Sequence, residues 1–179
     1  LLDDEWHSLN FVQDKSFLDV VGTHGIGANC IPQNLINWLW LHTVGWTETL
    51  LFLPSVLCAI AGLLLFPVLV ARLAGRTVAL FFAWLLAISP CLVFYSRIVR
   101  PYSMVLFFGF FALTCLALWT REGKSRWRLV YALSGFVAIF FHLYAALPVL
   151  APLGALWLLV LIRPRILADT PWISARALV

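Results

Sequence analysis

Long apolar stretches alternate with short charged loops over most of this chain. A helix of about 20 apolar residues crosses the roughly 30 Å hydrocarbon core of a bilayer. Stretches of that length run over 49–71, 77–95 and 102–120. Each is bounded by charged residues or by a proline, so each is predicted to be one membrane-spanning helix.

The apolar stretch 127–162 is too long for a single crossing. Proline removes a backbone donor and clashes with the preceding turn, so we expect a break near Ala145–Pro148. The helices on either side would cover 127–145 and 147–162. The whole pattern predicts an all-α, polytopic membrane bundle over 48–165, with about five spans.

Residues 1–47 are the polar part of the chain and hold most of its acidic residues. The glycine-containing segment 22–29 precedes Pro32, a residue that suits the first turn of a helix. After it, Leu35, Ile36, Leu39, Trp40 and Thr43 recur at three- and four-residue spacing. Three tryptophans in this region favour a position at a membrane surface. We predict an amphipathic interfacial helix within a first outer loop.

Composition agrees with this interpretation. Apolar residues make up 63% of the 179 residues, charged residues 11%, and the mean hydropathy is +0.98. Soluble domains have roughly 45–50% apolar and about 25% charged residues, so a soluble protein is excluded. The net charge of +4 comes from short basic clusters between apolar stretches. They form no continuous basic face, and we expect no nucleic-acid partner.

Basic residues in the loops predict the orientation of the bundle. They follow the first, third and fifth apolar stretches: Arg72 and Arg76; Arg121, Lys124, Arg126 and Arg128; Arg163 and Arg165. Cytoplasmic loops carry an excess of lysine and arginine, so we expect these three loops on the cytoplasmic side. The segment 1–47, the turn 96–101 and the turn 142–148 would then share the outer side.

Arg97 and Arg100 contradict the charge rule, because they lie in an outer turn that should contain few basic residues. They could reach outer headgroups or interact with the dipole at a helix end. Alternatively, their guanidinium groups bind a phosphate, whose geometry they match. Pro101 would then hold the two arginines close together.

Asp3, Asp4 and Glu5 lie on the same predicted side. Acidic clusters are common at helix starts, where they cap the helix and suit its dipole. A carboxylate held near a leaving phosphate can also act as the general base that deprotonates an acceptor. The outer face would thus hold a base and a phosphate clamp, two parts that sugar transfer from a lipid phosphate needs.

Several segments resemble, in order, the GT-C glycosyltransferases. They are the pair Asp4-Glu5, the helix IPQNLINWLWLHTVG, the stretch LPSVLCAIAGLLLFPVLVARLAGR, and LLAISPCLVFYSRIVRPYSMVLFF, which is similar to the family's "SP…YSR..RPY" segment. The closest likeness is to the dolichyl-phosphate-mannose–protein mannosyltransferase-like group, which includes bacterial aminoarabinose transferases. The resemblance covers about residues 3–120, and HLYA at 142–145 resembles the end of a later family helix.

The resemblance implies a polyprenyl-phosphate sugar as donor and a protein, lipid or glycan as acceptor. It implies that Asp4 or Asp3 is the catalytic base, with Glu5 in the same acidic motif. Arg97 and Arg100 would lie near the donor phosphate, flanked by Tyr95 and Tyr102. The protein would lie in a bacterial inner membrane with its active site facing the periplasm.

One departure from the family concerns Cys30, because many relatives carry a histidine just before the proline of the interfacial helix. His24 is a candidate substitute, and His142 is expected to line the site from the outer end of a later span. A metal would need His7 together with Asp3 and Asp4, which is weak support, so no cofactor is assigned.

Two other function classes stay open. A transporter or flippase for a lipid or anionic solute would also use helices interrupted by proline. A membrane scaffold would need none of the outer acids. We also expect the chain to be part of a longer protein, with a membrane helix before Leu1, a truncated segment starting at 166–179, and further helices after it.

Overall fold

The computed structural model describes residues 3–22, 30–45 and 47–162. The helices in these ranges are α1 (Asp3–Gln13), α2 (Phe17–Gly22), α3 (Ile31–Thr43), α4 (Glu48–Ala74), α5 (Arg76–Ile88), α6 (Pro90–Tyr95), α7 (Tyr102–Glu122), α8 (Ser125–Phe141), the 3₁₀ turn η1 (Leu143–Ala145) and α9 (Ala146–Ile162). The described residues contain no strand, which confirms the all-α prediction for them. His24, Trp46, Arg163, Arg165 and the segment 166–179 lie outside the described residues.

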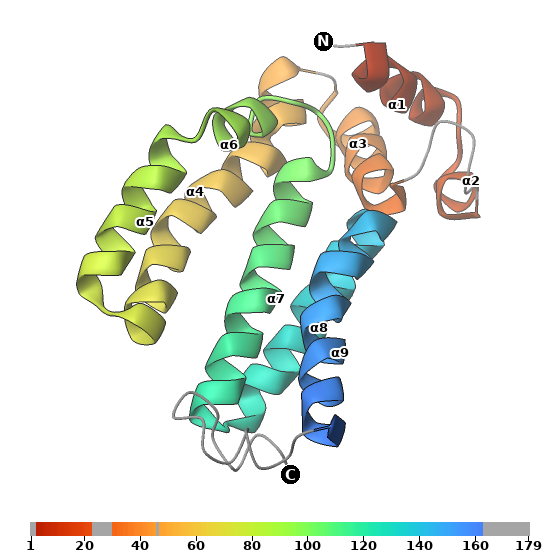
Figure 1. The fold of residues 1–179 in the computed structure, drawn as a ribbon. Helices are drawn as coiled ribbons and strands as arrows, with labels where there is room; N and C mark the ends of the chain where they lie inside the picture. Colours follow the sequence, from red (N-terminus) through yellow and green to blue (C-terminus); the bar gives the residue numbers. More distant parts are fainter. Residues whose placement is uncertain (1–2, 23–29, 46, 163–179) are drawn as a thin grey trace.

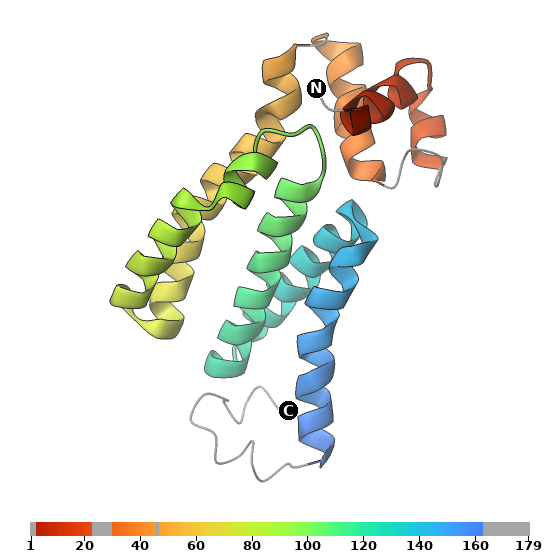
Figure 2. The ribbon, with the colours of Figure 1, turned by 45° about the horizontal axis from the view of Figure 1, so that its top comes forward.

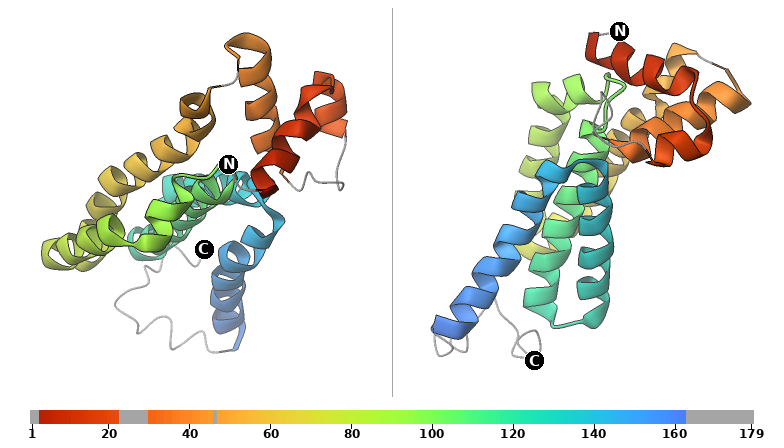
Figure 3. Two further views of the ribbon diagram at one scale, coloured as in Figure 1. Left: turned by 90° about the horizontal axis from the view of Figure 1, so that it is seen from above. Right: turned by 90° about the vertical axis from the view of Figure 1, so that its right-hand side faces the viewer.

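The helices α4, α5, α7, α8 and α9 run alternately in opposite directions, and the short α6 follows α5 before the chain turns into α7 (Figure 1). The α7–α8 hairpin forms the centre, α4 packs against both α5 and α7, and α9 contacts α7 and α8. The helices α1–α3 sit together at one end of the bundle, beside the turn 96–101 (Figures 1 and 2). We call this the α1–α3 end. The α4–α5 and α7–α8 turns lie at the opposite end, as Figure 3 also shows.

Among the described residues, three segments are long and apolar enough to cross a membrane: Glu48–Ala74, Tyr102–Glu122 and Leu143–Ile162. Their outward side chains fit a lipid environment, because large apolar residues such as Leu64 and Leu161 are mostly exposed. The expectation of five spans is met only in part. Helix α8 has 17 residues and α5 only 13, so neither reaches the length of the other three.

The predicted helix 77–95 is divided into α5 and α6 at Ser89. Pro90 lacks the backbone N–H that would continue the helix, so the chain restarts with Pro90 in its first turn. The Ser89 hydroxyl accepts a hydrogen bond from the Leu92 N–H at 3.4 Å and caps the new helix. The predicted helix 127–145 likewise ends early, at Phe141, where His142 adopts an extended backbone.

The opposite end is closed by glycines and by an arginine. Gly75 and Gly123 have φ angles of 87° and 64°, which favour glycine because other side chains crowd the backbone there. The Arg121 guanidinium, at the end of α7, donates to the carbonyls of Arg72 and Leu73 at the end of α4. Carbonyls at a helix end lack intrahelical partners, so this contact joins the two helices.

Helix α9 packs closely on α8. The Tyr131 hydroxyl donates to the Val149 carbonyl at 2.8 Å. Gly135 lies directly opposite, and a Cβ at this position would come within 2.8 Å of the Val149 Cγ1. The two helices can therefore approach this closely only because residue 135 has no side chain.

Helix α3 buries its polar face. Gln33, Asn34 and Asn37 are buried, while Leu39 on the apolar face is 48% exposed. In a soluble domain the apolar face of such a helix would point inward. Leu39 points outward, as a position at a membrane surface requires, whereas Ile36 of the same predicted stripe packs beside the buried Cys30 and Met104.

Candidate functional site

The turn Ser96–Pro101, which we call the arginine turn, connects α6 to α7. It begins where the N–H groups of Ser96 and Arg97 donate to the last carbonyls of α6, and it ends where the Pro101 carbonyl accepts from Val105 at 2.9 Å. Arg97 is exposed and Arg100 is half-buried. The turn therefore presents one guanidinium to the surroundings and holds the other partly inside the protein.

Between the two arginines, Ile98 and Val99 are buried. The Ser55 hydroxyl of α4 donates to the Ile98 carbonyl at 3.1 Å. The Val99 N–H donates to the Glu5 carboxylate of α1 at 2.5 Å. These contacts bring α1, α4 and the arginine turn together, although Glu5 and Val99 are 94 residues apart.

Aromatic rings form a row beside Arg100. The ring centroids of Tyr95 and Tyr102 are 5.1 Å apart, and those of Tyr102 and His142 are 6.1 Å apart. The Arg100 guanidinium carbon lies 6.0 Å from the Tyr102 ring centre, at the edge of the range for a cation–π contact. Four residues proposed from the sequence are thus brought together from α6, α7, the arginine turn and the residue before η1.

Cys30 lies at the start of α3 and is buried beside Met104 and Phe141. Burial raises the pKa of its thiol to about 12, although the positive charge of Arg100 acts in the opposite direction. A thiol with such a pKa stays protonated at neutral pH and is a poor nucleophile. The packing of Cys30 on Met104, in the first turn of α7, brings the start of α3 close to the end of the arginine turn.

Asp3 and Asp4 form the first turn of α1, so the acidic motif begins a helix as its sequence suggests. The side chains of Asp3, Asp4 and His7 lie outside what the structure describes. Glu5 is described and is 2% exposed. The backbone therefore places the acidic motif at the α1–α3 end, while the role of each acid as a base stays a prediction.

A row of buried amides on α3 was not identified from the sequence. Ser8 of α1 donates to Asn34 Oδ1 at 2.8 Å, and Gln33 Nε2 donates to Asn37 Oδ1 at 3.0 Å. Further buried atoms of this face lack a hydrogen-bond partner: Gln33 Oε1, Asn34 Nδ2, Asn37 Nδ2 and Trp40 Nε1. Such groups are costly to bury. The signal in the sequence was the spacing of the three amides along one helical face.

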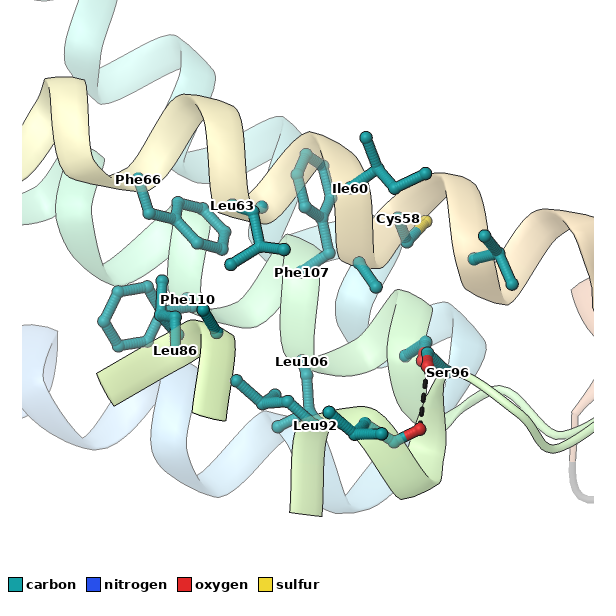
Figure 4. Close-up of a pocket in the computed structure, with 16 residues that line it drawn as sticks. Cys58, Ile60, Leu63, Phe66, Leu86, Leu92, Ser96, Leu106, Phe107 and Phe110 are labelled. Carbon is teal, nitrogen blue, oxygen red and sulfur yellow. Dashed lines mark hydrogen bonds between the residues drawn. The ribbon is translucent and has the colours of Figure 1, made fainter. Parts of the chain in front are cut away.

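An apolar cavity of about 270 Å³ lies between α4, α5, α6 and α7 (Figure 4). Its wall includes Phe66, Leu86 and Phe107, and Ser96 and Ser103 line it where α6 and α7 meet the arginine turn. The Ser103 hydroxyl of α7 donates to the Tyr95 carbonyl at the end of α6 at 2.9 Å, and this bond joins the two helices at the base of the turn. The cavity therefore adjoins the segment that carries the two arginines, an arrangement that fits a molecule with an apolar chain and an anionic group.

No group of three or more histidine, cysteine or acidic side chains comes together in the part of the chain that the structure describes. The cluster considered from the sequence, His7 with Asp3 and Asp4, falls on side chains outside that part. His24, the candidate substitute for the family's histidine, also falls outside it.

The functional assignment therefore depends on the residues themselves and on where the fold places them. Comparison of the chain with protein-family models, with curated proteins and with solved structures found no match.

Proposed function

We propose that this chain carries the reaction centre of a membrane glycosyltransferase that takes a sugar from a polyprenyl-phosphate donor. The observation that carries the proposal is the convergence at the α1–α3 end. There Arg100 lies beside Tyr102, the acidic motif begins α1, and an apolar cavity adjoins the arginine turn. A lipid-linked donor needs these three elements together, namely a site for its chain, cations for its phosphate and a base for the acceptor.

In this mechanism the polyprenyl chain enters the apolar cavity, and Arg97 and Arg100 hold the phosphate. An acceptor hydroxyl or amine attacks the anomeric carbon of the sugar while the bond from that carbon to the phosphate oxygen breaks. Asp4, or Asp3, takes the acceptor's proton. The departing polyprenyl phosphate gains negative charge, and the arginines stabilise that charge.

The proposed orientation puts the α1–α3 end on the outer, periplasmic side of a bacterial inner membrane. It is supported by the basic residues at the opposite end, where Lys124, Arg126 and Arg128 follow α7. The chain path fits five crossings if the pair α5–α6 and helix α8 complete the three longer spans.

A transporter for a lipid or an anionic solute is the second candidate. One observation favours it, the interruption between α5 and α6, because transporters use broken helices at their binding sites. Such proteins place polar or charged groups near the middle of the membrane. Helix α5 contains no charged residue after Arg76, its first residue, and α9 contains none at all. The apolar interior of these helices favours the transferase over the transporter.

The test is sugar transfer by the full-length protein in membrane vesicles, with a radiolabelled polyprenyl-phosphate sugar and an acceptor extract. Asp4→Asn, Asp3→Asn, Arg97→Ala and Arg100→Ala are compared with Arg126→Ala at the opposite end as control. Loss of charge stabilisation predicts a fall in rate of about 10²–10³-fold for the arginine variants and for one of the acids. Full transfer by every variant would refute the mechanism, and lost solute uptake with intact transfer would favour the transporter.

A further inference from the structure

The peptide bond between Ile98 and Val99 lies at the centre of the arginine turn and is held from both sides. Its carbonyl oxygen accepts a hydrogen bond from Ser55 of α4, and its N–H donates to Glu5 of α1. Both side chains are almost inaccessible, with 1% of Ser55 and 2% of Glu5 exposed. Two helices that are distant in sequence therefore fix the orientation of one peptide unit.

This peptide unit depends on its side-chain partners. Backbone hydrogen bonds lie before and after it, from the Arg97 N–H to the Phe94 carbonyl and from the Val105 N–H to the Pro101 carbonyl. Because Ile98 and Val99 are buried, loss of either side chain would leave a backbone group without a partner and away from water. The peptide would then rotate to find another partner.

The orientation of this peptide affects the two arginines, because it lies between them. Arg97 precedes Ile98 and Arg100 follows Val99, so the held peptide is the link between the two guanidinium-bearing residues. A rotation of the link changes the distance and the angle between them. Two cations bind one phosphate well only when their geometry is fixed before the ligand arrives.

We infer that Glu5 and Ser55 are positioning residues that fix the Ile98–Val99 peptide and, through it, the spacing of Arg97 and Arg100 around a bound phosphate. The second half of this inference rests on the proposed transfer reaction, while the first half concerns the turn alone. It gives Glu5 a different task from its neighbour Asp4, because the Glu5 carboxylate is already occupied by a backbone N–H.

Three substitutions and two controls test this inference. Glu5→Gln keeps an oxygen that accepts from Val99 but loses the basicity of a carboxylate, whereas Glu5→Ala loses both. Ser55→Ala removes the donor to Ile98. The matched controls are Glu48→Ala, an exposed acid in the first turn of α4, and Ser134→Ala, whose hydroxyl bonds to the Val130 carbonyl of its own helix.

Limited trypsin digestion of the full-length protein in nanodiscs reports on the turn without requiring any activity. The bond after Arg97 is the relevant one, because trypsin cleaves poorly before proline and Arg100 precedes Pro101. We expect cleavage after Arg97 to be about tenfold faster in Glu5→Ala and Ser55→Ala, as for the loss of a buried hydrogen bond. Glu5→Gln and both controls should match the unmodified protein. The double Ala variant should show less than the product of the single effects.

Transfer kinetics complete the test. Glu5→Ala and Ser55→Ala should raise KM for the polyprenyl-phosphate donor by about tenfold, and Glu5→Gln should restore most of the loss. Unchanged cleavage in both Ala variants would overturn the inference. If Glu5→Gln is as inactive as Glu5→Ala while its cleavage is normal, transfer depends on the basicity of the Glu5 carboxylate, and the proposed link from the held peptide to phosphate binding is overturned. If the cleavage pattern is as expected but neither the unmodified protein nor any variant transfers sugar, the held peptide is supported and the proposed function is refuted.

Discussion

The two ends of the bundle use polar residues in opposite ways. At the α1–α3 end, Glu5 contacts Val99, Ser55 contacts Ile98 and Ser8 contacts Asn34, and each pair joins residues at least 26 positions apart. At the opposite end, Glu122 binds Lys124 at 2.7 Å and accepts from Trp127 at 3.0 Å, both within five residues. At this end the Arg121 guanidinium also reaches the Arg72 and Leu73 carbonyls of α4, but these contacts are exposed. The α1–α3 end therefore has buried polar contacts, whereas the opposite end has polar contacts at or near its surface.

This difference indicates which end of the bundle is the better candidate for a functional site. Charged groups at a solvated surface need not be desolvated, and they contribute little to stability. They are therefore suited to setting the orientation of a protein in the membrane. Buried polar groups cost stability unless every one is satisfied. The α1–α3 end nevertheless keeps several amide atoms without partners. A region that retains such groups at a cost in stability is where selection for function is expected.

The amide pair Gln33–Asn37 offers the largest effect on stability. Asn37→Leu removes the acceptor of Gln33 Nε2 and leaves that donor buried, which should lower the free energy of unfolding by about 1–3 kcal/mol. Adding Gln33→Met removes the unpaired donor as well and should recover most of the loss. Unfolding in mixed micelles of increasing SDS content measures both.

Thr43→Val is the matched control for the amide pair, because Thr43 is exposed and its hydroxyl bonds to Leu39 of the same helix. Thr43→Val should change the free energy of unfolding by no more than about 0.5 kcal/mol. A double variant that is less stable than Asn37→Leu alone would contradict the interpretation. The buried amides would then stabilise the α1–α3 end instead of costing it stability.

Gly135 tests the packing between the two ends. Gly135→Ala places a Cβ 2.8 Å from Val149 Cγ1, and overpacking of this kind should cost about 1–3 kcal/mol in SDS unfolding. The control is Gly154→Ala in α9, where a Cβ meets nothing within 4 Å. Combining Gly135→Ala with Val149→Ala should relieve part of the clash. Equal stability of Gly135→Ala and Gly154→Ala would show that α8 and α9 separate easily.

Most of the fold could be predicted from the sequence because apolar length and proline are local signals. Pro101 separates two helices as predicted, and Tyr102–Glu122 follows the expected span 102–120 closely. The division at Ser89 was missed although its signal was present, since a serine followed by proline is the usual start of a helix. Apolar composition alone cannot distinguish one long helix from two shorter consecutive helices.

The site was only partly predictable. Arg100, Tyr95, Tyr102 and His142 were selected from the sequence, and the fold places them in one row. Ser55 was missed, because a single serine within an apolar stretch gives no sign of its partner. Its hydrogen bond to Ile98 spans 43 residues, and only the folded chain reveals such a pair. The same reason explains why Glu5 was grouped with Asp3 and Asp4 by adjacency.

Substitution of Glu122 should have the smallest effect on stability, and it offers a direct comparison with substitution of the buried Glu5. Glu122→Ala removes the contacts to Lys124 and Trp127, yet these groups lie at the surface, where an ion pair contributes about 0–1 kcal/mol. The stability lost in Glu122→Ala should be smaller still at high salt, because salt screens exposed charges. Glu5→Ala, measured in the same SDS series, should cost more and depend little on salt, since it strands a buried N–H. If Glu122→Ala proved the more damaging change, the two ends would not differ in the way their contacts imply.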